Sequence, residues 1–350
     1  MFPITPLPRT LEAALRDLTA KRAEIRKSAL TDLVRFSDGN SRDTVVRELR
    51  KVLRLDVDHD VRAFASVACA DASLTEMLPD LFVALGDKSP RVTQFALVAI
   101  GELSTEPTEE ELARIVSYLH SELPALRYQS LSTLYRLCPA RYRLELDQAI
   151  RDPDPEIRWL GWHLLDDWFE KIDTNQIEEP IAGNYEKELA RRELVLLATD
   201  APPRVRIEAA TFLLRIEPSA AQKLLLPLLE RPHGLERGQG ERAIDRLGRL
   251  NCRECIPWLT KQARTGWFET TNGWASLCAL ARMGEVEPKK RIVAELNSSN
   301  ARRRNRALDA VRDLKILEAL GTVEGFVKSG VAGITFSELE AVARELKQNP

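Results

Sequence analysis

A pattern of small and apolar positions repeats nine times along the chain. Each repeat is marked by an anchor residue, which is Arg in seven repeats and Thr in two. A small residue stands three positions after every anchor and an apolar residue seven positions after it, and an aliphatic residue precedes the first six anchors. The anchors are Arg26, Arg62, Thr93, Arg127, Arg158, Arg206, Arg237, Thr270 and Arg304.

These offsets predict one helix in every repeat, which we call the anchored helix. Positions −1, +3 and +7 from the anchor lie on one face of a helix with 3.6 residues per turn, so they form a buried stripe. A small residue at +3 lets a neighbouring backbone approach closely. Pro and Asp cluster just before several anchors, as in segments 86–92 and 151–158, where they suit a helix start and its cap.

A second amphipathic stretch precedes many anchored helices, so each repeat is predicted to be a helical hairpin. Successive anchors are 31 to 36 residues apart, except for one gap of 48. The long gap contains segment 172–184, whose Pro, Gly and Asn content predicts an inserted loop. The second stretches cover 41–54, 74–85, 109–120, 185–198, 218–230 and 252–264.

Two segments, 87–103 (DKSPRVTQFALVAIGEL) and 152–165, resemble the turn and second helix of HEAT-like repeats, which also occur in phycobilin lyases. The resemblance covers about residues 10 to 315, and it rests on the nine consistent registers. It implies an all-α protein, a right-handed α-solenoid of about nine hairpins whose anchored helices line the concave face. We therefore expect a solenoid over 1–315 and a capping segment over 316–350, which ends in a helix at about 337–347.

The anchor arginines have a structural interpretation within this resemblance. In HEAT-like units the Arg pairs with a turn Asp of its own or the preceding repeat, and such Asp residues are present here. We therefore expect salt bridges between repeats rather than a ladder of phosphate-binding groups. The expected partners are Asp60, Asp87, Asp154 and Asp200.

Composition narrows the classes of function. The 51 basic and 53 acidic side chains give a net charge of −2, without the basic excess of a dedicated nucleic-acid binder. No apolar run is long enough for a membrane span, no secretory signal is visible, and five scattered cysteines suggest reduced thiols, so we expect a cytoplasmic protein. Metal-ligand clusters, catalytic signatures and glycine-rich phosphate loops are absent, so we expect no metal, no cofactor and no enzyme activity.

Aromatic and acidic residues follow the anchors of the second to fifth repeats. Offsets +1 and +2 are expected to project into the concave groove, and offsets +5, +8 and +9 lie further along the same helices. A contiguous aromatic stripe bordered by acid would mark a docking surface, because exposed aromatic rings are costly unless a partner covers them. Some of these rings alternatively turn into the core between helices. The candidate residues are Phe64, Phe95, Tyr128, Tyr135, Trp159, His163, Asp166 and Asp167.

Charge is distributed unevenly along the chain. Residues 51–200 carry 16 basic and 28 acidic side chains, whereas residues 201–350 carry 25 basic and 18 acidic ones. Such asymmetry can orient a charged partner along a groove. The basic half contributes three further candidate partner-binding residues, Arg242, Arg246 and Arg306.

The sequence favours a scaffold or regulatory adaptor that binds a protein partner through its concave surface. The resemblance extends this expectation to a small GTPase or its regulator. One alternative is an enzyme of the same fold, either a DNA glycosylase, for which Trp162 and Asp166 show a superficial likeness, or a bilin lyase. The other is nucleic-acid binding through the basic half. A glycosylase groove must also hold the phosphate backbone of DNA, and residues 151–200 carry a net charge of −7, which is the wrong sign for that contact. The sequence does not determine the partner, the pathway or the oligomeric state.

Overall fold

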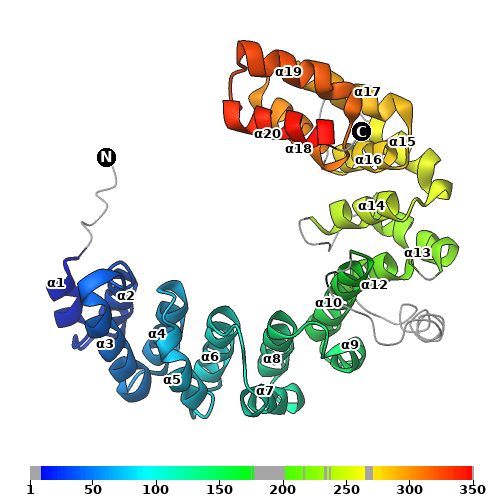
Figure 1. The fold of residues 1–350 in the computed structure, drawn as a ribbon. Coiled ribbons are helices and arrows are strands. Elements are labelled where there is room, and N and C mark those ends of the chain that lie inside the picture. The colour runs from blue at the N-terminus through cyan, green and yellow to red at the C-terminus, as the bar shows by residue number, and fades with distance from the viewer. Residues whose placement is uncertain are drawn as a thin grey trace. The chain divides into compact units, whose positions relative to one another are not determined.

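The computed structural model describes residues 9–174, 176, 202–215, 217–231, 235, 238–264 and 271–348. Every regular element in these ranges is a helix. The chain divides into two compact units, residues 1–180 and 181–350. Within each unit the helices form consecutive hairpins, and the chain is an α-solenoid (Figure 1).

The first unit consists of two rows of helices. Each inner helix packs against the outer helix before it, and consecutive inner helices of the row pack against each other. Figure 1 shows the first unit curving so that the inner row lies on its concave side. The outer row is α1 (Leu11–Asp17), α3 (Arg42–Leu55), α5 (Leu78–Ala84), α7 (Glu109–Val116) and α9 (Arg143–Ala149), with short 3₁₀ turns at Gly39–Ser41, Thr75–Met77 and Ser117–His120. The inner row is α2 (Ala23–Val34), α4 (His59–Asp71), α6 (Pro90–Leu103), α8 (Pro124–Leu137) and α10 (Pro155–Asp173).

Local sequence explains where the inner helices begin. Pro90, Pro124 and Pro155 stand in the first turn of α6, α8 and α10, where a missing N–H costs no helical hydrogen bond. The side chain of Asp58 caps α4 by accepting from the backbone N–H groups of residues 60 and 61 at 2.8 and 3.2 Å. Asp154 caps α10 in the same way. The Pro and Asp clusters therefore start the helices that the sequence predicted.

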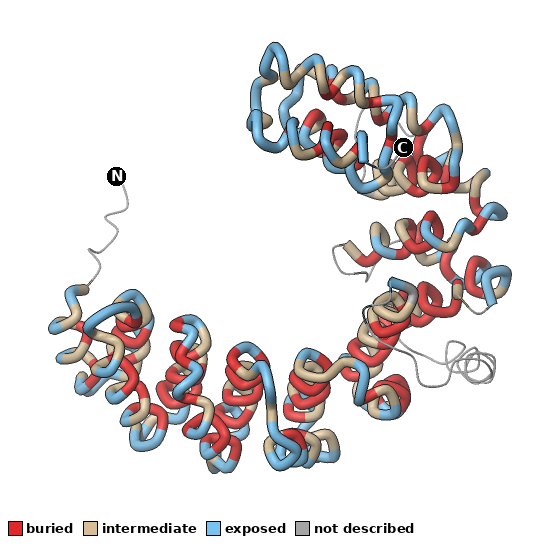
Figure 2. The backbone as a smooth tube through the Cα atoms, in the orientation of Figure 1, coloured by how far each residue is buried: buried red, intermediate tan, exposed pale blue. Residues whose placement is uncertain are grey.

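The core lies between the two rows and along the faces where inner helices meet (Figure 2). At offset +3 of the first unit, Ala29, Ala65, Ala96 and Ser130 are fully buried. A Cβ on Gly161, the fifth member, would lie 2.8 Å from the main-chain nitrogen of Ile150 at the end of α9. The residues at offset +7 in the same unit, Leu33, Cys69, Ile100, Leu134 and Leu165, are fully buried as well.

Three anchor arginines of the first unit, Arg26, Arg62 and Arg127, join consecutive repeats. Arg62 donates two hydrogen bonds of 2.8 Å to the carboxylate of Asp87, which precedes α6. Its third nitrogen donates to the main-chain oxygen of Asp56, in the turn before its own helix, at 2.8 Å. Arg26 and Arg127 make the same pairs of contacts with the turns on either side of their helices.

This geometry corrects the expected partner. The carboxylate comes from the turn of the following repeat, and the anchor's own turn contributes a carbonyl oxygen instead. Of the four expected aspartates only Asp87 accepts in this way within the described residues, and Asp200 lies outside them. Thr93 takes the place of an arginine by donating its hydroxyl proton to the main-chain oxygen of Leu85 at 3.1 Å.

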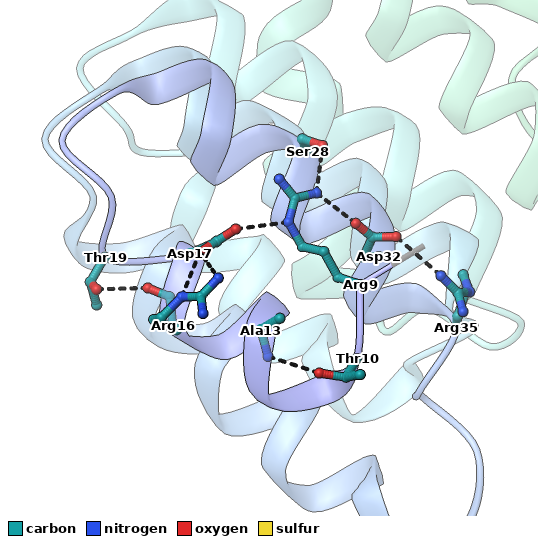
Figure 3. A network of polar contacts seen from close by, with 9 residues as sticks. All are labelled: Arg9, Thr10, Ala13, Arg16, Asp17, Thr19, Ser28, Asp32 and Arg35. Carbon is teal, nitrogen blue, oxygen red and sulfur yellow. Dashed lines mark hydrogen bonds and ion pairs between the residues drawn. The ribbon is translucent and has the colours of Figure 1, made fainter. Parts of the chain in front are cut away.

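The first hairpin is fastened by Arg9, which precedes α1 (Figure 3). Its guanidinium donates to Asp17 at the end of α1 at 2.8 Å and to Ser28 and Asp32 of α2 at 2.8 and 2.7 Å. The side chain of Thr10 caps α1. One arginine therefore connects both helices of the hairpin.

The second unit continues the hairpins with weaker regularity in its sequence. Its helices are α12 (Pro203–Leu213), α13 (Pro218–Glu230), α14 (Gln239–Arg249), α15 (Ile256–Arg264), α16 (Thr271–Arg282), α17 (Val286–Glu295), α18 (Ala301–Asp313), α19 (Leu320–Ser329) and α20 (Phe336–Gln348), with 3₁₀ turns at Arg253–Cys255 and Leu317–Ala319. Gly248 approaches the Cα of Ala279 so closely that an added Cβ would lie 2.8 Å from it.

The final helix forms close to where the sequence places it. Thr335 and Glu338 make reciprocal hydrogen bonds at the start of α20, and its buried residues Leu339, Val342 and Leu346 accompany contacts with α18 and α19. The division at residue 315 into repeats and cap stays a prediction. The expected loop at 172–184 lies mostly outside the described residues, and α10 extends to Asp173. No helix in the described ranges is long and apolar enough to cross a membrane.

Candidate interaction surface of the first unit

A hollow of about 370 Å³ opens on the inner row between α2, α4 and α6. Phe64 and Phe95 supply its aromatic surface, and both rings are half-buried because their inner edges pack against the core. Ala63 adds a small apolar wall. The remaining lining residues are polar or charged: Glu24, Lys27, Ser28, Thr31, Asp60 and Arg91.

The charged groups at this hollow are paired with one another. The Nε of Arg91 lies 2.8 Å from a carboxylate oxygen of Asp60, and its guanidinium carbon lies 5.5 Å from the centre of the Phe95 ring. Lys27 lies 2.9 Å from Glu24. Two acidic and two basic side chains therefore surround the aromatic surface and leave no net charge, so the hollow suits an apolar side chain with a polar border.

A second cluster lies where α8 meets α10. Tyr135 is 6% exposed, and its hydroxyl donates to the carboxylate of Asp167 at 2.6 Å. Lys171 pairs with the same carboxylate, and its Nζ lies 5.1 Å from the centre of the Tyr135 ring. Burial and the hydrogen bond to Asp167 raise the pKa of the Tyr135 phenol. Burial alone would raise the pKa of Asp167, but hydrogen bonds from Lys171 and Tyr135 outweigh it and hold that pKa below its usual value.

Two aromatic rings stack beside this cluster on α10. The rings of Trp159 and His163 are nearly parallel, at an angle of 3°, and their centres are 5.5 Å apart. Both side chains are half-buried, and the four-residue spacing places them one above the other on one helix face. They form a flat aromatic surface one helical turn long.

The predicted continuous stripe is thus divided into three groups. The structure brings Phe64 and Phe95 together at the hollow, Tyr135 and Asp167 at the α8–α10 contact, and Trp159 and His163 in the stack. Tyr128 is half-buried on α8 between them. The expectation that Tyr135 faces the groove is wrong, because the residue is buried between two inner helices, where its hydroxyl donates to Asp167. Asp166 is half-buried on α10 beside Asp167.

The three basic candidates belong to the second unit, and their guanidinium groups are engaged within it. Arg246 is 7% exposed, so little of its side chain is open to a partner, and its role as a partner-binding residue stays a prediction. Arg242 lies 2.5 Å from the buried carboxylate of Glu208. The guanidinium of Arg306 lies 4.0 Å from the centre of the Trp274 ring. The sequence pattern places these guanidinium groups on a solvated basic face. In the structure, Arg242 forms an ion pair and Arg306 stacks on an aromatic ring.

Several residues at the hollow were missed by sequence reasoning. Lys27, Ser28, Asp60 and Arg91 occupy offsets −2, +1 and +2 from their anchors, as do Ala63, Phe64 and Phe95. The repeat register contains the signal for these residues, because they stand at the same offsets as the aromatic candidates or one turn before them. At offset −2, in the first turn of each anchored helix, the sequence pattern predicts only a cap.

The described ranges give little support to a glycosylase-like site, a reactive thiol pair or a metal site. Trp162 is 2% exposed, so the Trp162–Asp166 likeness to a glycosylase does not present an indole to the surface. The thiols of Cys252 and Cys255 are buried, and burial raises the pKa of Cys255 to about 12. No group of three or more His, Cys, Asp and Glu side chains that could hold a metal ion occurs among the described residues.

Comparison with known proteins gives structural neighbours only. No protein-family model matches the sequence, and no curated protein matches it either. An engineered protein is 16% identical with a TM-score of 0.37, and the alignment covers 97% of this chain and 98% of that one. Kap121p bound to RanGTP is 13% identical with a TM-score of 0.46, over 97% of this chain and 40% of that one. The complex of CpcE and CpcF of phycocyanin lyase from Nostoc sp. PCC7120 is 14% identical with a TM-score of 0.39, over 89% and 98%.

Proposed function

We propose that this chain is a non-enzymatic scaffold that binds a protein partner through the inner row of its first unit. The supporting observation is the hollow between α2, α4 and α6, where the rings of Phe64 and Phe95 are only half-buried. Aromatic residues and arginine are enriched at protein interfaces, and partly exposed rings in a concave site are typical of the points that contribute most binding energy. Phe64, Phe95 and Arg91 are the residues expected to contact the partner first.

Charge favours a protein over a nucleic acid at this surface. Residues 51–174 carry 22 acidic and 13 basic side chains, a net charge of −9. A nucleic-acid backbone requires cationic groups along its path, and its affinity rises with each phosphate that they neutralise. The hollow itself is neutral, because Arg91 and Lys27 are paired with carboxylates. A small GTPase or its regulator is the partner class that the HEAT resemblance adds to this proposal.

The proposal is tested by filling the hollow without disturbing the core. Thr31 is exposed and lines the hollow, so Thr31→Arg places a long side chain over the aromatic rings while the buried residues keep their contacts. The full chain and the variant are used to capture proteins from a lysate of the source organism, and each captured protein is then purified and titrated against both. We expect the variant to bind at least tenfold more weakly with an unchanged melting temperature.

Val83→Arg is the matched control. Val83 is 59% exposed on α5 in the outer row, so the same long cation is added to the opposite side of the hairpins. This variant should keep the wild-type affinity. Equal binding by wild type and Thr31→Arg would show that the hollow is not the binding site.

A further inference from the structure

Residues 1–8 of the chain are attached beside the hollow between α2, α4 and α6. Arg9, the first described residue, donates from its guanidinium to the hydroxyl of Ser28 at 2.8 Å. Ser28 is one of the residues that line the hollow. Further hydrogen bonds from the same guanidinium to Asp17 and Asp32 hold Arg9 against both helices of the first hairpin (Figure 3). The preceding residues are therefore tethered within about one arginine side-chain length of the hollow.

The chemistry of residues 1–8, MFPITPLP, suits this hollow. They contain no charged side chain, and the apolar residues Phe2, Ile4 and Leu7 are separated by proline and threonine. The centre of the hollow is aromatic, and its four charged side chains form two ion pairs. An uncharged apolar segment can therefore cover the rings without leaving a charge unpaired.

The length of the segment matches the spacing of the inner helices. Three of its eight positions are proline, which favours an extended polyproline II backbone. Such a backbone advances about 3.1 Å per residue, so Ile4 stands about 12 Å and Phe2 about 19 Å from Pro8. Packed helices have axes about 8 to 10 Å apart, so α4 is one such step from α2, and α6 is two. Ile4 therefore reaches Phe64 on α4. Phe2 reaches Phe95 on α6.

The α2 side of the hollow allows an extended backbone to approach. Ser28 and Thr31 have short side chains and are exposed there, and Ala63 forms the adjoining wall on α4. The hydroxyl of Ser28 accepts from Arg9 and keeps its own proton for donation. A proline-rich segment has few N–H donors but a carbonyl oxygen at every residue, so a hydroxyl donor is the partner that it needs.

Tethering makes a weak contact effective. A short connection holds a segment at an effective concentration of about the millimolar range, and its prolines lower the entropy lost on binding. Resting on the proposed scaffold function, we propose that residues 1–8 cover the hollow as an internal ligand, with Ile4 against Phe64 and Phe2 against Phe95. A protein partner must then displace this segment before it contacts the rings.

Photocrosslinking in the full chain tests the position of the segment. Phe2 is replaced by the photoreactive p-benzoylphenylalanine, and the peptides joined on irradiation are identified by mass spectrometry. We expect adducts on α4 and α6 within a single chain, and their loss when Thr31→Arg fills the hollow. Val83→Arg, on the outer row, is the matched control and should keep the adducts. No adduct, adducts confined to the outer row, or adducts only between two chains would each overturn the proposal.

Competition with a free peptide tests the occupancy of the hollow. The probe is a fluorescein-labelled peptide with the sequence of residues 1–8, titrated into wild type and into the full-length double variant Phe2→Ser/Ile4→Ser. We expect the double variant to bind the probe at least about threefold more tightly, because no internal copy competes. Thr5→Ser keeps both apolar side chains and should bind as wild type does. Adding Thr31→Arg to the double variant should abolish binding.

Two results of this titration contradict an internal ligand: equal affinity of wild type and the double variant, or no binding by either. Circular dichroism of the double variant should match that of wild type, because the substitutions precede the first helix. A protein captured as a partner should also bind the double variant more tightly than wild type, and equal affinity would show that the segment does not compete.

This proposal and the partner site fail separately. Adducts on α4 and α6 together with a partner that is insensitive to Thr31→Arg would leave the internal ligand standing and remove the hollow as a partner site. A partner that is weakened by Thr31→Arg, with no adducts on α4 or α6, would give the reverse result.

Discussion

Arg62 and Asp87 belong to consecutive repeats and are joined by two hydrogen bonds of 2.8 Å across 25 positions of sequence. Their side chains are 6% and 15% exposed. Asp87 also accepts from the backbone N–H of Ser89 at 2.8 Å, so the carboxylate holds its own turn in place as well as the preceding helix. The contact therefore helps to hold these two consecutive hairpins in register.

Replacing Arg62 should therefore be costly. Arg62→Met leaves the carboxylate of Asp87 poorly solvated without its cation, and removing one member of a buried pair costs about 3 to 5 kcal/mol of unfolding free energy. The control is Arg136→Met, whose partner Glu102 is also in the neighbouring repeat but exposed. That change should cost less than about 1 kcal/mol. Urea unfolding at pH 7 measures both, and equal losses would contradict the structural role of the Arg62 pair.

The same pair predicts a pH dependence. The hydrogen bonds from Arg62 hold the pKa of Asp87 below its usual value, despite the opposing effect of burial. A carboxyl group with a lowered folded-state pKa contributes stability that is fully present above the unfolded-state pKa of about 3.9 and is lost as the pH falls through the folded-state pKa. We expect the difference in unfolding free energy between wild type and Asp87→Asn to be constant from about pH 7 to 5 and to shrink below about pH 4. A difference that grows on acidification would have the wrong sign.

Gly161 should tolerate no larger residue. Its added Cβ would lie within 3.0 Å of three atoms of Ala149 and Ile150, two of them main-chain atoms, so the helices must separate. Gly161→Ala should cost about 1 to 3 kcal/mol, although alanine is the better helix former. Gly325 in α19 has no atom within 4 Å of the corresponding position, so Gly325→Ala should stabilise the chain by about 0.5 to 1 kcal/mol. Thermal melting distinguishes the two, and a stabilised Gly161→Ala variant would refute the close helix contact.

The hydroxyl group of Tyr135 should contribute to the free energy of unfolding. Tyr135→Phe removes the 2.6 Å hydrogen bond to Asp167, and a bond to a charged acceptor is worth about 1.5 to 3 kcal/mol. The buried hydroxyl of Tyr142 has no hydrogen-bond partner among the described residues, so Tyr142→Phe should be neutral or slightly stabilising. Comparison of their denaturation midpoints is the measurement. Similar effects at both positions would mean that the hydrogen bond adds nothing beyond ring packing.

The repeat register predicts many residues of the candidate site, but it does not predict which of them lie together. The offsets correctly brought Phe64 and Phe95 to one surface, because both stand two residues after an anchor on adjacent inner helices. They failed for Tyr135, which the same count places on the groove. At offset +8 a side chain can turn toward the neighbouring helix, and the hydrogen bond to Asp167 settles which way this one turns.

The sequence by itself determined the helical hairpins, the buried face of each anchored helix and the starts of the inner helices, because these depend on periodicity, side-chain size and capping within one repeat. Only the tertiary structure decided which repeat supplies the carboxylate partner of Arg26, Arg62 and Arg127, and which of the aromatic candidates lie together. Those outcomes depend on distances between helices about 30 residues apart. Local spacing fixes the face on which a residue lies, whereas packing against a neighbour decides what that residue contacts.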